Sequence, residues 1–301
     1  MDFEAAFRTA MERNGTAYRE ARQALISAPG ALEFLGPRRA SADWKTALTA
    51  DILAGWIGHR IEFDQCTEYV QGRLPGRPPV TGSFVPRQRV AAITRLGKTV
   101  IPRLLEMAWK TNDWGDDQGS SAVFGALIQF KDPRTGLMLL ELARPGHDPG
   151  LRPLAVATLG QLHDGRAVPE LLALLHDSAE PEMLRATTAE SLGALGADAA
   201  GPDLKAVLLD DKLDPEFRQA AARALRALGH PDAAPALLDA LSKTHDPTLM
   251  LVLLDALGDV GGESSLGPLR KLEEHAQEDF IRQAARDARE KAEERLKAAK
   301  P

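Results

Sequence analysis

Two stretches of the sequence decide the fold: LRPLAVATLGQLHDGRAVPELLALLHD at residues 151–177 and FRQAAARALRALGHPDAAPALLDAL at residues 217–241. In each, a segment rich in alanine and leucine ends near a glycine, and a proline then opens a short apolar segment with helical spacing. Proline is tolerated in the first turn of a helix, because the N–H that it lacks would have no partner there. The stretches therefore predict pairs of helices. Their prolines recur every 33 residues, at Pro169, Pro202, Pro235 and Pro268.

Each predicted unit consists of a first helix (helix A), a turn containing glycine, a second helix that starts at the proline (helix B), and an acidic residue followed by proline. An acidic side chain in that place can cap the next helix A. Because the glycines follow the phase of the repeat, we interpret them as turn glycines. Weaker copies of the unit occupy residues 89–107 and 120–143. The acidic-proline pairs are Asp148-Pro149, Glu180-Pro181, Asp214-Pro215 and Asp246-Pro247.

Stacked helical hairpins of this kind form an array in which each unit contacts its neighbours. We therefore predict an all-α fold, an α-solenoid of antiparallel hairpins wound into a right-handed superhelix. We expect an N-terminal helical cap or divergent repeats at 1–73, a loop rich in proline and glycine at 74–86, the repeat array at 87–279, and a charged capping helix at 280–301. The interior is predicted to hold Leu171, Leu174, Leu204, Leu237 and Leu241.

The pattern of an arginine, spaced alanines, Leu-Gly and a helix that starts at proline resembles HEAT-like repeat proteins of the phycobilisome-lyase type. The resemblance covers roughly residues 89–280, and it rests on several copies in register. It implies the solenoid fold. Proteins with such repeats include partner-binding proteins, chaperones and a few enzymes, so the resemblance implies an architecture rather than one activity.

Composition narrows the class of function. The 301 residues carry a formal net charge of −6, with 44% hydrophobic and 27% charged residues, as in ordinary globular proteins. The acidic balance disfavours a surface built entirely for nucleic acid, so we do not expect a nucleic-acid partner. The single cysteine, Cys66, excludes a disulfide framework. No apolar run reaches the roughly 18 residues that span a bilayer, so we expect a cytoplasmic protein without a membrane partner.

Charge is unevenly distributed along the chain. Residues 73–110 hold eight basic residues and one acidic residue, whereas residues 176–216 hold ten acidic residues and three basic ones. Such polarity can steer a charged partner, and it would also allow head-to-tail association of two copies. An ordinary solvated surface gives the same pattern, and the two interpretations stay open.

We predict a non-catalytic scaffold or adaptor that binds a protein partner and needs no cofactor or metal. The stacked B helices are expected to present exposed polar side chains on a concave surface. The basic loop, with Phe84 at its tip, is the second predicted surface. The residues predicted to contact a partner are Arg73, Arg77, Phe84, Arg87, Arg89, Arg95, Arg103, Glu106, Glu170, Lys205, Asp239, Arg270 and Lys271.

Three alternatives stay open. A HEAT-like DNA glycosylase would need aromatic and acidic residues such as Trp109, Asp113, Trp114, Asp116 and Asp117 beside the basic stretch. A metal-dependent HEAT-repeat hydroxylase would need convergent ligands. The His-Asp pairs that begin at His147, His163, His176 and His245 fall in predicted turns, where capping explains them more simply. A chaperone similar to bilin lyases is the third alternative, and no feature of the sequence points to tetrapyrrole binding.

Overall fold

A computed structural model describes residues 1–12, 15–74, 85–109 and 117–298. The described residues form helices and no strands, which confirms the predicted all-α fold. Contacts divide the chain into two compact units, Met1–Met138 and Leu139–Pro301, and each is described by itself. The domain limits predicted from the sequence and the handedness of the superhelix stay predictions.

The first unit starts with a group of helices that share one apolar core. Phe7 of α1, Leu25 of α2, Leu35 of α3 and Leu53 of α4 are all buried in it. Further along, α6 and α7 are joined through a short 3₁₀ turn, as in the predicted weak repeat at 89–107. The helices are α1 (Phe3–Met11), α2 (Gly15–Ser27), α3 (Ala31–Arg39), α4 (Trp44–Gly58), α5 (Arg60–Val70), α6 (Val85–Arg95), α7 (Ile101–Trp109) and α8 (Asp117–Phe130), with α9 (Pro133–Ala143) crossing into the second unit.

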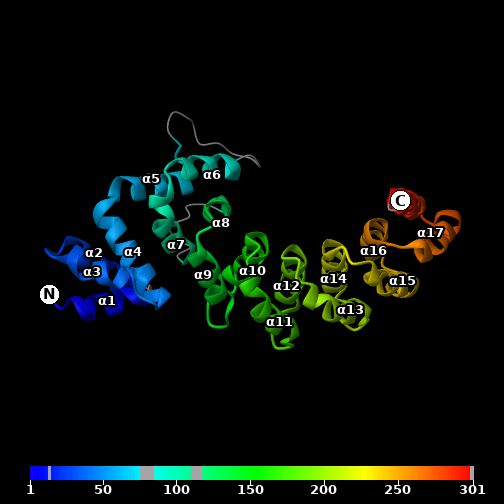
Figure 1. The fold of residues 1–301 in the computed structure, drawn as a ribbon, viewed down its shortest axis with the longest axis horizontal. Helices are drawn as coiled ribbons and strands as arrows, with labels where there is room; N and C mark the ends of the chain where they lie inside the picture. The colour runs from blue at the N-terminus through cyan, green and yellow to red at the C-terminus, as the bar shows by residue number, and fades with distance from the viewer. Residues whose placement is uncertain (13–14, 75–84, 110–116, 299–301) are drawn as a thin grey trace. The chain divides into compact units, whose positions relative to one another are not determined.

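The second unit is the regular array, with its A helices in one row and its B helices in another (Figure 1). Most A helices are followed by a glycine or acidic turn and a 3₁₀ turn, which leads into the B helix. The A helices are α10 (Leu151–Leu162), α12 (Glu182–Ala194), α14 (Pro215–Leu228), α16 (Pro247–Val260) and the charged α18 (Asp279–Ala298). The B helices are α11 (Val168–His176), α13 (Gly201–Leu209), α15 (Ala234–Lys243) and α17 (Glu263–His275).

The prolines start three of the four B helices as predicted. Pro169, Pro202 and Pro235 each stand at the first or second position of their helix. The prediction is wrong for Pro268, which lies inside α17. This helix begins at Glu263 without a preceding 3₁₀ turn, and the residues between Glu263 and Pro268 already belong to it. Of the predicted core leucines, four are buried, and Leu174 is half-buried while its neighbour Leu175 fills the interior.

In every A helix of the second unit except α16, an arginine links helix A to the helix before it. The last carbonyls of a helix lack partners within it, and a cation there also interacts favourably with the helix dipole. In the second unit the arginine donates to such a carbonyl in four repeats. The donor-acceptor pairs are Arg152 Nε to Ala143 O (2.8 Å), Arg185 Nε to Leu175 O (2.9 Å), Arg218 Nε to Leu208 O (3.0 Å) and Arg282 Nη1 to Ala276 O (2.6 Å).

The same link occurs in the first unit and corrects the prediction for Arg89. This side chain is buried, and its Nη1 donates to the carbonyl of Val70, the last residue of α5, at 2.7 Å. Gly72, with a φ of +83°, leaves room for the guanidinium, because a Cβ there would lie 2.6 Å from Arg89 Nη2. Arg89 is therefore a structural residue of the repeat and not an exposed contact for a partner.

Glycines inside the A helices set the spacing of their row. A Cβ on Gly160 would lie 2.8 Å from Ser191 Cα, and one on Gly193 would lie 2.6 Å from Ala224 Cα. Gly258 faces Ala288 in the same way at 3.2 Å. These three glycines are helical, so their interpretation as turn glycines is wrong. They let neighbouring A helices pack backbone against backbone.

This close packing also decides which helices line the inner side of the array. Neighbouring A helices contact one another extensively, whereas neighbouring B helices contact each other sparsely. In the second unit the row of A helices accordingly follows the inside of the bend (Figure 1). The prediction that B helices form the concave surface is therefore wrong, because the glycines that permit close approach are on the A helices.

Candidate partner-binding site

A groove of about 400 Å³ lies between α12 and α14 on the row of A helices. Its apolar lining comes from Ala186 and the buried Phe217, and Met183 stands beside them with 70% of its surface exposed. An exposed large apolar side chain on a preformed concave surface is typical of interaction sites. Sequence reasoning missed this groove, although Met183 lies within the acidic stretch 176–216 that it singled out.

Carboxylates dominate the polar lining of the groove. They belong to Glu182, Glu190, Asp214 and Glu216, and the single cationic residue of the lining is Arg223. Arg223 Nη2 is 2.7 Å from Glu190 Oε1, so this cation is already paired. The groove thus has an apolar floor and a negatively charged rim.

Farther along the same row, the charges are balanced by ion pairs between helices. Arg226 of α14 pairs with Asp255 and with Asp259 of α16, the latter with a distance of 2.8 Å from Nε to Oδ2. Lys291 of α18 pairs with Asp259 at 2.7 Å. The chain therefore supplies its own cations to these two gaps between A helices, as Arg223 does for Glu190 in the groove between α12 and α14.

Arg103 and Glu106, predicted as exposed contacts, form a buried cluster in the first unit instead. Glu106 is 1% exposed, and among the described residues its carboxylate accepts hydrogen bonds from Tyr18 and Arg22 of α2, Trp56 of α4 and Arg103 of α7. Oε1 accepts from Tyr18 Oη at 2.5 Å and Arg22 Nη1 at 2.8 Å. Oε2 accepts from Trp56 Nε1 and Arg103 Nη1, both at 2.9 Å. Burial and the neighbouring Glu106 charge raise the pKa of Tyr18, so the phenol stays a donor.

The Trp56 ring lies close to both guanidinium groups of this cluster. The Cζ atoms of Arg22 and Arg103 are 4.8 Å and 5.0 Å from its centroid, within the range of cation–π interactions. Arg103 Nε also donates to Thr67 Oγ1 at 3.1 Å. The cluster joins α2, α4, α5 and α7. It holds the first unit together, which corrects the prediction that Arg103 and Glu106 meet a partner.

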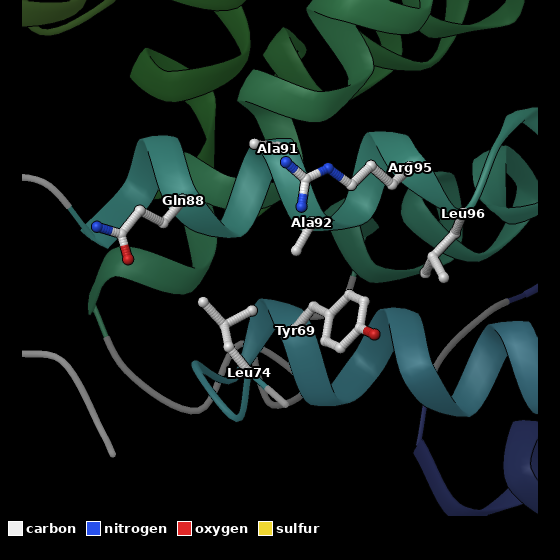
Figure 2. Close-up of a pocket in the computed structure, with 7 residues that line it drawn as sticks. All are labelled: Tyr69, Leu74, Gln88, Ala91, Ala92, Arg95 and Leu96. Carbon is white, nitrogen blue, oxygen red and sulfur yellow. The ribbon is translucent and has the colours of Figure 1, made fainter. Parts of the chain in front are cut away.

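The predicted basic surface is only partly described. Arg77 and Phe84 lie outside the described residues. Arg73 is exposed and pairs with Glu68, with 2.7 Å between Nη2 and Oε1, and Arg87 is exposed at the start of α6. Arg95 is exposed and lines a pocket of about 270 Å³ between α5 and α6. Figure 2 shows its guanidinium near Ala92, with Tyr69 on the facing helix.

Comparison with protein families gives a match to HEAT repeats at residues 136–214 and 209–289, just over half of the chain. The chain belongs to the HEAT-repeat family. A search of the curated proteins found no match. The matched HEAT repeats contain the groove between α12 and α14 and the ion pairs beside it. HEAT repeats are generally scaffolds for protein interaction. The phycobilisome-lyase subtype stays a prediction, because the match is to HEAT repeats in general.

The polar residues predicted on the B helices are exposed or half-buried on the outer row of the HEAT array. Arg270 and Lys271 are exposed on α17. The other three take part in surface ion pairs, which contribute little stability individually. The pairs are Glu170 Oε1 with Arg144 Nε (3.1 Å), Lys205 Nζ with Asp232 Oδ2 (2.7 Å) and Asp239 Oδ2 with Lys243 Nζ (2.9 Å).

The remaining candidate chemistry of this HEAT protein concerns Cys66, metal ions and the tryptophan-acidic segment. Burial raises the pKa of the Cys66 thiol to about 12, so the sulfur is neither accessible nor ionised. The described ranges contain no group of three His, Cys, Asp or Glu residues placed to hold a metal ion. Asp113, Trp114 and Asp116 lie outside the described residues. None of the described helices is long and apolar enough to cross a membrane.

Proposed function

We propose that this HEAT-repeat chain is a non-catalytic scaffold or adaptor that binds a protein partner along the inner row of its A helices. The observation that carries the proposal is the groove between α12 and α14, with the exposed Met183 beside an apolar floor. The helices that form it are held by packing and by the repeat arginines. A partner would therefore meet a preformed surface and would lose little free energy to ordering it.

Charge supports a protein partner over a nucleic acid. The lining of the groove carries four carboxylates and one paired arginine, and phosphate groups would be repelled there. The exposed arginines of the first unit, Arg73, Arg87 and Arg95, and the outer-row residues Arg270 and Lys271 remain proposed secondary contacts. A cytoplasmic location stays a prediction from the sequence.

Site-specific photocrosslinking tests this function. A photoreactive phenylalanine analogue is placed at Thr187 in the groove, and matched proteins carry it at Arg270 on the outer row or at Arg95. After irradiation in nuclease-treated lysate of the source organism, we expect a defined protein adduct from Thr187, and less of it or none from Arg270 and Arg95, which are proposed only as secondary contacts. An adduct from Arg270 alone would contradict binding on the inner row. The absence of protein adducts at all three positions would contradict the scaffold function.

A further inference from the structure

We propose that the groove between α12 and α14 accepts a partner segment in which a lysine or arginine stands next to an apolar side chain. This inference rests on the proposed scaffold function and specifies the chemistry of the partner. It is carried by the apolar floor and by three carboxylates of the rim, those of Glu182, Asp214 and Glu216, with which no cationic side chain of the described residues pairs.

The apolar half of the site consists of Met183, Ala186 and the buried Phe217. Methionine is flexible and polarizable, so it adapts to aliphatic or aromatic side chains of different shapes. The volume of about 400 Å³ has room for one or two side chains and not for a whole helix. The groove therefore fits side-chain anchors of a segment that lies across α12 and α14.

Backbone N–H groups hold two of the carboxylates on the rim in place. Glu182 Oε2 accepts from the backbone N–H of Asp214 at 3.1 Å, and Asp214 Oδ1 accepts from the N–H of Glu216 at 2.8 Å. Each of these hydrogen bonds holds one oxygen of its carboxylate in place. Within the described residues, no cationic side chain pairs with Glu182, Asp214 or Glu216. A partner cation would meet a preorganised negative surface beside an apolar one.

In the neighbouring gaps between A helices, a cation of the chain itself bridges the carboxylates. Between α14 and α16 the carboxylates are bridged by Arg226, and between α16 and α18 they are bridged by Lys291. The gap between α12 and α14 has one such bridge, where Arg223 meets Glu190, but it also holds Glu182, Asp214 and Glu216, with which no cationic side chain in the described part of the chain pairs. A lysine or arginine of the partner would supply a second bridge in this gap, where Glu182 and Glu216 lie.

The test uses three fluorescent 12-residue peptides, each with three copies of Gly-Xaa-Leu-Ala, where Xaa is Lys, Gln or Glu. Their binding to the full chain is measured by fluorescence anisotropy at low and high salt. We expect the lysine peptide to bind most tightly and the glutamate peptide to bind at least tenfold more weakly. Binding of the lysine peptide should weaken as salt rises, because the attraction is between exposed charges.

Matched variants locate the binding. E182Q/E216Q removes two charges from the rim, and the control E278Q/E294Q removes two exposed charges elsewhere in the same unit. We expect the first variant to bind the lysine peptide at least tenfold more weakly and the control to stay within twofold of the unchanged protein. Circular dichroism checks that both are folded. Equal binding by the two variants, or equal binding of the lysine and glutamate peptides, would overturn the inference.

The adduct formed at Thr187 separates this inference from the proposed function. Mass spectrometry of the crosslinked peptide identifies the segment that lies in the groove. A segment with a basic residue beside an apolar one supports the inference. A segment without a basic residue, or a second copy of this chain, would leave the scaffold function standing and overturn the inference.

Discussion

Replacing Glu106 by glutamine should destabilise the first unit strongly. The amide keeps the shape of the carboxylate but removes the charge that faces Arg22 and Arg103. The carboxylate accepts from four donors, Tyr18, Arg22, Trp56 and Arg103. Each oxygen of the carboxylate accepts two of these hydrogen bonds. In glutamine an NH2 group, which is a donor, replaces one oxygen, so two of the hydrogen bonds cannot form. Removing one partner of a buried ion pair costs about 3–5 kcal/mol, and we expect a loss of that size.

Tryptophan fluorescence during urea unfolding measures this loss. All four tryptophans of the sequence fall within residues 1–138, so their emission reports on the first unit. With a denaturant slope of about 2 kcal/mol per molar urea, a loss of 4 kcal/mol would lower the midpoint by about 2 M. Glu33→Gln is the control, because Glu33 is an exposed acidic residue of the same unit.

A midpoint for Glu106→Gln within experimental error of the midpoint for Glu33→Gln would refute the reasoning. In that event the four hydrogen bonds would contribute no net stability, and desolvation of the charges would offset them fully. Circular dichroism recorded in the same samples follows the helices of both units and shows whether the second unit stays folded.

Three further predictions concern the repeat structure and the cysteine. Gly193→Ala should destabilise the array by about 1–3 kcal/mol in thermal unfolding, because the new methyl group meets the backbone of the next helix. Gly165→Ala, in the 3₁₀ turn before α11, has no such contact and should change the stability by less than about 1 kcal/mol. Destabilisation of equal size by both would contradict packing through Gly193. Cys66 should react with a thiol reagent only after denaturation, and prompt reaction in native buffer would show that it is accessible. Arg218→Ala should cost about 1–3 kcal/mol by removing the charged donor to the Leu208 carbonyl, and unchanged urea unfolding would contradict that role.

The repeating helices were predictable from the sequence because their signals are local. Proline at the start of a helix and an acidic cap act within one turn, so Pro169, Pro202 and Asp214 marked helix starts correctly. The prediction that Pro268 starts a helix was wrong, because a proline can also lie inside a helix that begins at another residue.

The candidate site was harder to predict because burial depends on distant segments. Glu106 is a polar residue on an apolar helix, which suggests exposure, but its partners Tyr18 and Trp56 lie 88 and 50 residues away. Arg89 offered a usable signal, because it occupies the arginine position of the repeat. The choice between A and B helices as the inner row depended on whether Gly160 and Gly193 were helical or in turns. Sequence spacing alone does not separate these cases.

The glycines of the inner row have a further consequence for the size of anything that binds there. The closest approaches of neighbouring A helices occur at one position per repeat, which is Gly160, Gly193 or Gly258, and the corresponding residue of α14 in the sequence is Arg226. The three glycines therefore set how closely the A helices approach one another at these points of the array. Substitutions at this position would change the distance between successive contact points for a partner without altering any residue that touches it.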